Sequence, residues 1–557
     1  MIIKVISWSK NKPLTDSKTD FYLERDDWND FSYYTYYHLH VSKKHTRDNT
    51  NTLIGGVKIL KARQKKDEIF LIDLGYIDKL ASNFCSLGQS LDYYERISQL
   101  NQDTQDYILS ALNDIIYNPK IKLQFENEEA YRDSLLRYID ANDDMFSLAP
   151  ILLSGDFEKL PDKDLRFSFN FKNFEAEVEF DFTSPTFKVD WSDEESLPDR
   201  ISVIVGRNGS GKSTLMAKIS KIVFASSNDR GILNDIGSIK PKGLGFPRII
   251  NISYSAFDTF NVPGIRPQEK RQISNDIKSG VGRYIFCGIR DICGELDRGL
   301  KKMESQTDEH GILTNALLND KQEYNLLKPI TSLTKEFNSS LKKISESKQR
   351  LEILRFTFGI ISQETSLSNL REVEISDLLS DESFFSELST GHKFVLHAIT
   401  NIIQHVENRS LILFDEPETH LHPPLLAVLM KSLRFILSSM NSFMIVGTHS
   451  PVVVQETLSR HVYIIRREGN LTALSRPEIQ TYGENIGIIT SHVFELSSDI
   501  TDYHEELDKV VQSFITHTNK SERQIILEKI EELFDGALSL QARGYIMSKI
   551  NEKNEEA

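Results

Sequence analysis

The chain has 557 residues, of which 39% are hydrophobic and 26% are charged, and its formal net charge is −15 at pH 7. This composition is typical of a globular protein with more than one lobe. The negative charge argues against a surface that coats nucleic acid nonspecifically. Three cysteines without neighbouring histidines exclude a disulfide framework and a zinc site. Because residues 1–10 do not read as a secretory signal and no apolar run is long enough for a membrane span, we expect a cytoplasmic protein.

The first part of the chain is expected to contain two segments. Residues 1–68 are expected to form a β-rich N-terminal part of the fold, because residues 31–41 and 53–60 are crowded with aromatic and apolar side chains. These runs are typical of an antiparallel layer. Residues 69–160 have apolar residues near helical spacing around positions 107–116, which predicts a small helical insertion.

A phosphate-binding loop is predicted between an apolar strand at 201–205 and a helix that begins at the loop's end. Its glycines let the backbone curve around a phosphate, and its N–H groups face the anion together with the helix N-terminus. Lys212 is expected to reach the β- and γ-phosphates, and the Ser213 hydroxyl to bind Mg²⁺. The predicted nucleotide-binding residues are Gly206, Arg207, Asn208, Gly209, Ser210, Gly211, Lys212, Ser213 and Thr214. The loop defines an ATPase core over residues 161–265, in which 165–171 and 175–182 alternate as antiparallel strands do.

A mostly helical insertion is predicted at 266–380. Leu341, Ile344, Lys348 and Leu351 are spaced as in a weak coiled-coil seam that the lysine breaks, and it is far shorter than an SMC-type arm.

Acidic and histidine side chains follow two further apolar runs within a second core segment, residues 381–500. Asp415 and Glu416 end the run at 411–414, where Asp415 is expected to hold Mg²⁺ and Glu416 to activate water. His449 follows the run at 443–446, and we expect it at the same sheet edge, where it contacts the γ-phosphate. With Lys212, these two residues form the predicted catalytic set. Upstream, Ser389 is expected to cap a helix.

The order of these motifs resembles ATP-binding-cassette ATPases of the SMC, RecF and overcoming-lysogenization-defect group. The resemblance implies an α/β head with a mixed sheet, an antiparallel β layer, helical insertions and a helical C-terminal tail. It also implies that Ser389, Gly391 and Lys393 of one protomer complete the ATP site of another, so that a homodimer or higher oligomer encloses Mg-ATP. No glutamine stands where the group places its metal-sensing residue, and Asp258 is our interpretation for that place.

A closer resemblance is to the PtuA ATPases of Septu and retron-associated antiphage systems. It rests on residues 20–30, 416–423, 447–451 and 482–487. It implies an HNH nuclease partner similar to PtuB and, in a retron setting, a reverse transcriptase with its RNA and msDNA. Residues 501–557 are too few and too helical for the Toprim nuclease domain of the overcoming-lysogenization-defect group, so we expect that this chain cuts nothing itself. That tail is expected to pack on the ATPase or to dock a nuclease subunit.

Three functional hypotheses follow. The first is an ATPase of an antiphage complex whose nucleotide state controls a partner nuclease. The second is a DNA-repair ATPase of the RecF or SMC kind that clamps DNA directly. The third, a scaffold that binds ATP without turnover, is disfavoured because binding alone does not need Glu416.

Overall fold

The structure is a computed structural model in which two compact units, Met1–Glu484 and Asn485–Ala557, are described separately. No helix among the described residues combines the length and the apolar character that crossing a membrane requires. The described residues are 1–7, 14, 16–27, 29–46, 49–69, 71–140, 142–160, 165–183, 199–305, 307, 312–313, 321–322, 324–371, 373, 375–381, 383–494, 502–517 and 523–555.

The N-terminal lobe is built on a six-stranded sheet with the order β5-β1-β2-β3-β4-β6. Helices α1 (Leu91–Ser98), α2 (Gln102–Ala111) and α3 (Met145–Ser154) complete the lobe. One hydrophobic core joins residues from Ile3 to Leu160. The strands are β1 (Ile3–Ile6), β2 (Phe21–Arg25), β3 (Tyr36–Val41), β4 (Thr52–Lys61), β5 (Gly75–Ile77) and β6 (Phe84–Gly88).

The two expectations for this lobe have different outcomes. The segments at 31–41 and 53–60 contain antiparallel neighbours, β3 and β4, as expected, in a sheet separate from the one that carries the phosphate loop. The segment 69–160 is not helical throughout, because β5 and β6 form the two edges of the N-terminal sheet. Strand β5 has only three residues, and β6, which is buried after its first residue, does not show the polar–apolar alternation of a half-exposed strand.

The ATPase core is a seven-stranded sheet with the order β12-β11-β13-β14-β9-β15-β16, in which only β16 is antiparallel to its neighbour. The apolar runs at 201–205, 411–414 and 443–446 form β9, β13 and β14, as predicted. The strands are β9 (Ile201–Val205), β11 (Ile249–Ser253), β12 (Tyr284–Gly288), β13 (Leu411–Asp415), β14 (Phe443–Thr448), β15 (Val462–Glu468) and β16 (Leu471–Ser475).

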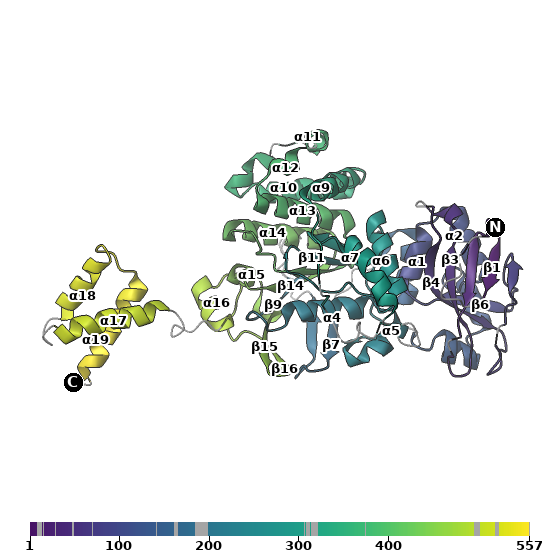
Figure 1. The fold of residues 1–557 in the computed structure, drawn as a ribbon, viewed down its shortest axis with the longest axis horizontal. Helices are drawn as coiled ribbons and strands as arrows, with labels where there is room; N and C mark the ends of the chain where they lie inside the picture. The colour runs from purple at the N-terminus through teal and green to yellow at the C-terminus, as the bar shows by residue number, and fades with distance from the viewer. Residues whose placement is uncertain are drawn as a thin grey trace, which may run out of the picture. The chain divides into compact units, whose positions relative to one another are not determined.

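Helices cover both faces of the core sheet. Helix α4 (Lys212–Phe224) lies on one side, and α13 (Thr390–His405) with α14 (Pro423–Ser439) lies on the other (Figure 1). A separate antiparallel sheet of β10 (Gly237–Lys240), β7 (Arg166–Phe171) and β8 (Val178–Asp181) supplies the predicted antiparallel layer. The fold class inferred from the sequence, an α/β phosphate-loop ATPase head with helical insertions, is therefore confirmed by the strand order and by the position of α4 after β9.

The segment 266–380 is mostly helical, as expected, but it also supplies the edge strand β12. The predicted seam lies on two helices, since Leu341 and Ile344 lie in α9 and Lys348 and Leu351 in α10, so the chain breaks just before Lys348. The break follows from Ser347, which caps α10 by accepting the backbone N–H of Arg350 at 3.4 Å. The helices of this segment are α6 (Pro267–Ser279), α7 (Ile292–Glu304), α9 (Ile330–Ser345), α10 (Lys348–Ile361), α11 (Ile375–Ser380) and α12 (Phe384–Glu387), while α5 (Ser227–Ile232) and α15 (Pro451–Gln455) lie outside it.

Buried ion pairs join the N-terminal lobe to the core. Arg283 lies 3.0 Å from Asp92, and Arg248 lies 2.9 Å from Glu95, both acids being on α1. All but Arg248 belong to the buried set of charged side chains. Because removing one partner would leave an uncompensated buried charge, these pairs fix α1 against the core.

The second unit contains α16 (Ile486–Val493), α17 (Asp502–His517), α18 (Arg523–Leu533) and α19 (Leu540–Glu555). Helices α17 to α19 share a small core around Leu507, Ile526, Ile530 and Ile546. The tail is therefore helical, as predicted, although this unit begins at Asn485 rather than at residue 501.

A buried lysine on α6 links the fold to pH. Lys270 is 3% exposed, and its Nζ donates to the Val262 carbonyl at 2.9 Å. Burial, and then the charge of Lys221, lower the pKa of Lys270 from 10.5 to about 7 against the opposing effect of Glu269. Because the unfolded chain then holds this proton where the folded chain has released it, the free energy of unfolding rises with pH between about 7 and 10.5.

We therefore expect the Lys270→Met protein to lose most of this pH dependence. From pH 7 to pH 9, the free energy of unfolding of the wild-type protein should rise by about 1–2 kcal/mol relative to that of the variant. Urea denaturation of both proteins at the two pH values measures the difference. If the free energies of unfolding of the wild type and the variant differed by the same amount at pH 7 and pH 9, a neutral, buried Lys270 would be contradicted.

Candidate functional site

Strand pairing brings the predicted side chains to one edge of the core sheet. Asp415, the last residue of β13, pairs with Ser253 of β11 and with Gly447 of β14. One residue further, Thr448 pairs with Val205, the last residue of β9. Because these strands are parallel, their carboxyl ends meet at the same edge, where open α/β sheets bind ligands.

Lys212 is the first residue of α4 and is 4% exposed. Its Nζ donates to the Gly206 carbonyl at 3.0 Å and to the Arg207 carbonyl at 3.4 Å, and it lies 2.6 Å from His449 Nε2. Burial lowers the pKa of Lys212, whereas Asp415, Glu416 and Glu418 favour its charged form. The loop therefore holds a cation at its mouth, as the sequence predicted.

The three predicted catalytic residues are brought together. His449 Nε2 lies 3.7 Å from Glu416 Oε1, in addition to its contact with Lys212. Burial, and then the charge of Lys212, lower the pKa of His449 to about 4, so the imidazole is neutral at pH 7. Glu416 adopts a left-handed backbone conformation with φ of 50°, a strained conformation that clusters at functional sites.

The two predicted metal ligands are adjacent. The Ser213 hydroxyl hydrogen bonds to the carboxylate of Asp415, while Asp415 Oδ1 is buried without a hydrogen-bond partner among the described residues. Burial, and then the charges of Glu416 and Asp258, raise the pKa of Asp415 to about 7. A carboxylate and a hydroxyl are the oxygen ligands that Mg²⁺ prefers alongside phosphate and water, so these residues fit that ion.

The remaining loop residues surround this point. Gly209 and Gly211 have φ of 80° and 103°, values that an L-residue rarely adopts. Arg207 and Asn208 are exposed, whereas Ser210 is buried. The Ser210 hydroxyl has no hydrogen-bond partner among the described residues, and Thr214 follows Ser213 in the first turn of α4. The backbone conformation is the one that a phosphate-binding loop needs.

The Ser389 turn is a helix start, as predicted. Ser389 caps α13 by accepting the backbone N–H of His392 at 3.4 Å. The nearest atoms to a side chain added at Gly391 belong to His420, Leu425 and Leu421, beginning with the His420 carbonyl at 3.1 Å. Lys393 lies on the same first turn. Within one chain, these contacts tie the turn to the segment after β13 rather than to the phosphate loop.

Two residues that the sequence analysis missed shape the site. Glu418 accepts the Thr448 hydroxyl at 2.8 Å and the backbone N–H of His449 at 2.5 Å, so it holds the histidine turn. Gly447 leaves room for the acid, because a Cβ there would lie 2.8 Å from Asp415 Oδ1. In the sequence, Glu418 could have been noticed as a third acid close to Asp415 and Glu416. Nothing in the sequence marked Gly447 as part of the site.

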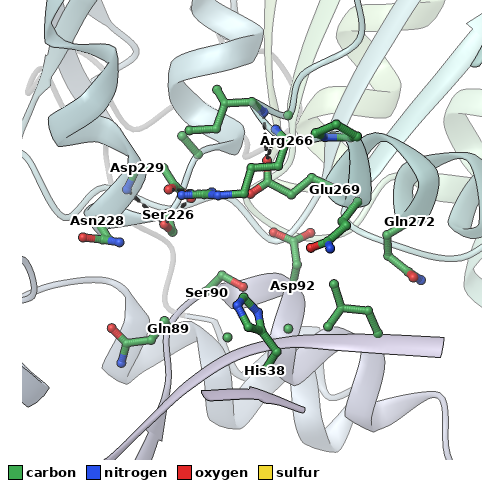
Figure 2. Close-up of a pocket in the computed structure, with 18 of the residues that line it drawn as sticks. His38, Gln89, Ser90, Asp92, Ser226, Asn228, Asp229, Arg266, Glu269 and Gln272 are labelled. Carbon is green, nitrogen blue, oxygen red and sulfur yellow. Dashed lines mark hydrogen bonds and ion pairs between the residues drawn. The ribbon is translucent and has the colours of Figure 1, made fainter. Parts of the chain in front are cut away.

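A cavity of about 1040 Å³ lies at the end of α4 that is far from the phosphate loop, and it is not the phosphate site. Its lining includes His38 and Ser90 of the N-terminal lobe and Arg266 of the core. Figure 2 shows Arg266 beside acids of the core. Its guanidinium lies 2.9 Å from Asp229 and 2.6 Å from Glu269, so this cation is already neutralised. A helix of thirteen residues, roughly 20 Å long, separates this cavity from Lys212.

Comparisons with known proteins give a family match for part of the chain and similarities to solved structures. Residues 257–455 match a family described as "AAA domain, putative AbiEii toxin, Type IV TA system". Among solved structures, the SMC head domain from Thermotoga maritima is 13% identical and covers 57% of this chain and 100% of its own, with a TM-score of 0.24. UvrA2 from Deinococcus radiodurans is 14% identical and covers 57% of this chain and 38% of its own, also with a TM-score of 0.24. Because these scores are low, the fold assignment rests on the strand order and the loop.

A relative with a curated sequence matches almost end to end. Protein ea59 of Escherichia phage lambda is 30% identical over 547 residues, which cover 97% of this chain and 96% of the relative. The chain therefore belongs to the same family as protein ea59 of phage lambda.

Proposed function

We propose that the chain binds Mg-ATP at the edge of the core sheet and hydrolyses it. The observation that carries this proposal is the contact of Lys212 with His449, with Glu416 3.7 Å from the same imidazole. A phosphate loop alone would support binding. An exposed carboxylate beside a neutral histidine also supplies the groups needed to place and deprotonate a water.

Each residue has a separable role in this proposal. Mg²⁺, held by Ser213 and Asp415, would neutralise charge on the β- and γ-phosphates. When nucleotide is bound, Lys212 donates its hydrogen bonds to phosphate oxygens and no longer to the Gly206 carbonyl and His449. Glu416, whose side chain is 35% exposed, orients the water and takes its proton. His449, neutral because its pKa is about 4, donates a hydrogen bond toward the γ-phosphate through one ring nitrogen.

Replacing Lys212 by alanine should abolish nucleotide binding. The variant loses the one buried ammonium at the loop, and ATP affinity should fall by at least 100-fold, on the order of 3 kcal/mol of charge-assisted hydrogen bonding. Calorimetric titration with ATP and Mg²⁺ measures the affinity. Retained tight binding would show that the phosphates lie elsewhere.

The Glu416→Gln protein should bind ATP but turn it over at least 100 times more slowly, because the amide cannot accept the proton of the attacking water. Binding is measured by titration, and turnover by phosphate release under saturating ATP. Turnover at the wild-type rate would remove Glu416 from the role of base.

We further propose that two copies of the chain enclose the nucleotide. Ser389, Gly391 and Lys393 form the start of α13, whose N-terminus suits an anion. Within one chain, the nearest neighbours of Gly391 belong to the segment after β13 and to α14, so we expect a triphosphate at Lys212 to meet such a turn from a partner copy. A two-fold pair would place each turn against the other copy's phosphate loop.

Charge at Ser389 tests this arrangement. Ser389→Asp keeps a good helix cap but adds a negative charge that repels the partner's triphosphate, whereas the matched control Ser389→Asn keeps the cap without the charge. We expect the Asp variant, and not the Asn variant, to lose ATP-dependent dimerisation in light scattering.

Mixing the Asp variant with Lys212→Ala should restore roughly a quarter of the wild-type turnover, because half of the pairs are mixed and each has one intact site. No recovery on mixing would contradict a shared site.

The biological role that we propose is antiphage defence, in which the nucleotide state controls a separate nuclease, similar to the HNH partner PtuB, with or without a reverse transcriptase and its RNA and msDNA. The family description of residues 257–455, which names a toxin–antitoxin system, supports a defence role. The relative that matches the chain almost end to end is itself encoded by a phage. The resemblance to PtuA motifs supports the choice of partner.

This role predicts that the purified chain leaves DNA and RNA intact. Linear and circular substrates incubated with the protein, ATP and Mg²⁺ should stay uncut, with Glu416→Gln as a parallel control. Cleavage that persists through stringent purification would show that the chain is itself a nuclease. ATP-dependent retention of DNA without cleavage would instead favour a RecF-like clamp.

A further inference from the structure

A small cavity beneath α4 contains more polar groups than the predicted metal ligands explain. Its volume is about 40 Å³, and its lining includes Ser213 and Asp415 together with Asn251, Ser253 and Asp258. Ser253 is the last residue of β11 and pairs in register with Asp415. Paired residues of parallel strands present their side chains to the same face, so both residues belong to the face that α4 covers.

Three oxygen atoms of the residues that line this cavity have no hydrogen-bond partner in the described part of the chain. Ser253 is 5% exposed, and its hydroxyl has no hydrogen bond to any described residue. Asn251 lies two positions earlier on the same face, and its amide donates to Ser220 and Tyr284 at 3.3 and 3.2 Å, which leaves its Oδ1 without a partner. Asp415 Oδ1 is the third. Because buried polar atoms are nearly always paired in folded proteins, three in one cavity indicate a shared polar occupant.

Asp258, our interpretation for the metal-sensing place, is already engaged by its own surroundings. Arg290 lies 3.2 Å from its carboxylate, and the backbone N–H of Phe260 donates to it at 2.9 Å. Arg290 is itself fixed by Glu295 at 2.7 Å, and both are 2% exposed. Asp258 therefore serves to hold the loop after β11. Ser253 lines the same cavity, and its hydroxyl has no partner among the described residues, so it is free to bind a group beside the metal.

We propose that Ser253 is a positioning residue for Mg²⁺, and that its hydroxyl holds a water bound to the metal when nucleotide is present. This inference rests on the nucleotide site proposed above. Mg²⁺ gives up its water reluctantly and keeps several waters in nucleotide sites. A cavity of about 40 Å³ has room for at least one of them, with Ser253 and Asn251 as its protein partners. The end of β11 would thereby respond to the presence of the metal.

The test separates metal affinity from nucleotide affinity. The Ser253→Ala protein should bind ADP in EDTA as the wild type does, but the Mg²⁺ concentration that half-saturates its binding of Mg·ADP should rise about tenfold, as for other groups that support metal ligands. Titration of fluorescent ADP with Mg²⁺ measures this shift without turnover. Ser253→Cys, nearly equal in volume and a weak hydrogen-bonding group, should shift in the same direction and serves if the alanine variant does not fold.

A matched control is Ser274→Ala on α6, whose hydroxyl is also buried and unpartnered, at 1% exposure, but which does not line this cavity. It should leave the Mg²⁺ dependence unchanged. Wild-type Mg²⁺ dependence in both Ser253 variants, or an equal shift in the Ser274 control, would overturn the assignment. Failure of Lys212→Ala to weaken ADP binding would instead overturn the nucleotide site itself, so the two failures are distinguishable.

Discussion

The in-register pairing of parallel strands is the constraint on which the site depends. Ser253, Asp415 and Gly447 are neighbours across three strands, and β9 ends beside them at Val205. A slip of one residue in any of these pairs would turn a side chain to the opposite face of the sheet. The fully buried strands β9 and β14 make such a slip costly, so the core packing fixes the chemistry at the edge.

The charges at that edge are unbalanced in a way that suits the proposed ligand. Asp415, Glu416 and Glu418 all act on Lys212, the cation of the phosphate loop. Burial raises the pKa values of Asp415 and Glu418 and lowers those of Lys212 and His449, so each charged form is disfavoured without a further partner. A bound divalent cation would stabilise the charged carboxylates, and a bound polyphosphate would stabilise the charged form of Lys212. The site is thus arranged for the pair rather than for either one alone.

Much of this was predictable because the strongest signals are local. The phosphate loop, the acid pair and the histidine turn each follow a fully apolar run, and parallel strands in one sheet bring such ends together. The break in the seam was predicted at Lys348, but the serine cap at position 347 that starts the second helix was not, because spacing alone does not show a cap. The edge strand β5 has only three residues, and β6 and β12 lack the polar–apolar alternation that marks a half-exposed strand. The roles of Ser253, Glu418 and Gly447 depend on register between strands distant in sequence.

The central claim, that one edge of the core sheet is a shared Mg-ATP site, is tested most directly by an experimental structure of the Glu416→Gln protein with ATP and Mg²⁺. The account predicts a triphosphate on the phosphate loop against Lys212, the metal beside Ser213 and Asp415, and the Ser389 turn of a second copy facing the γ-phosphate. A nucleotide bound in the cavity lined by Arg266, or one at the loop with the turns of all copies directed away from it, would contradict the account.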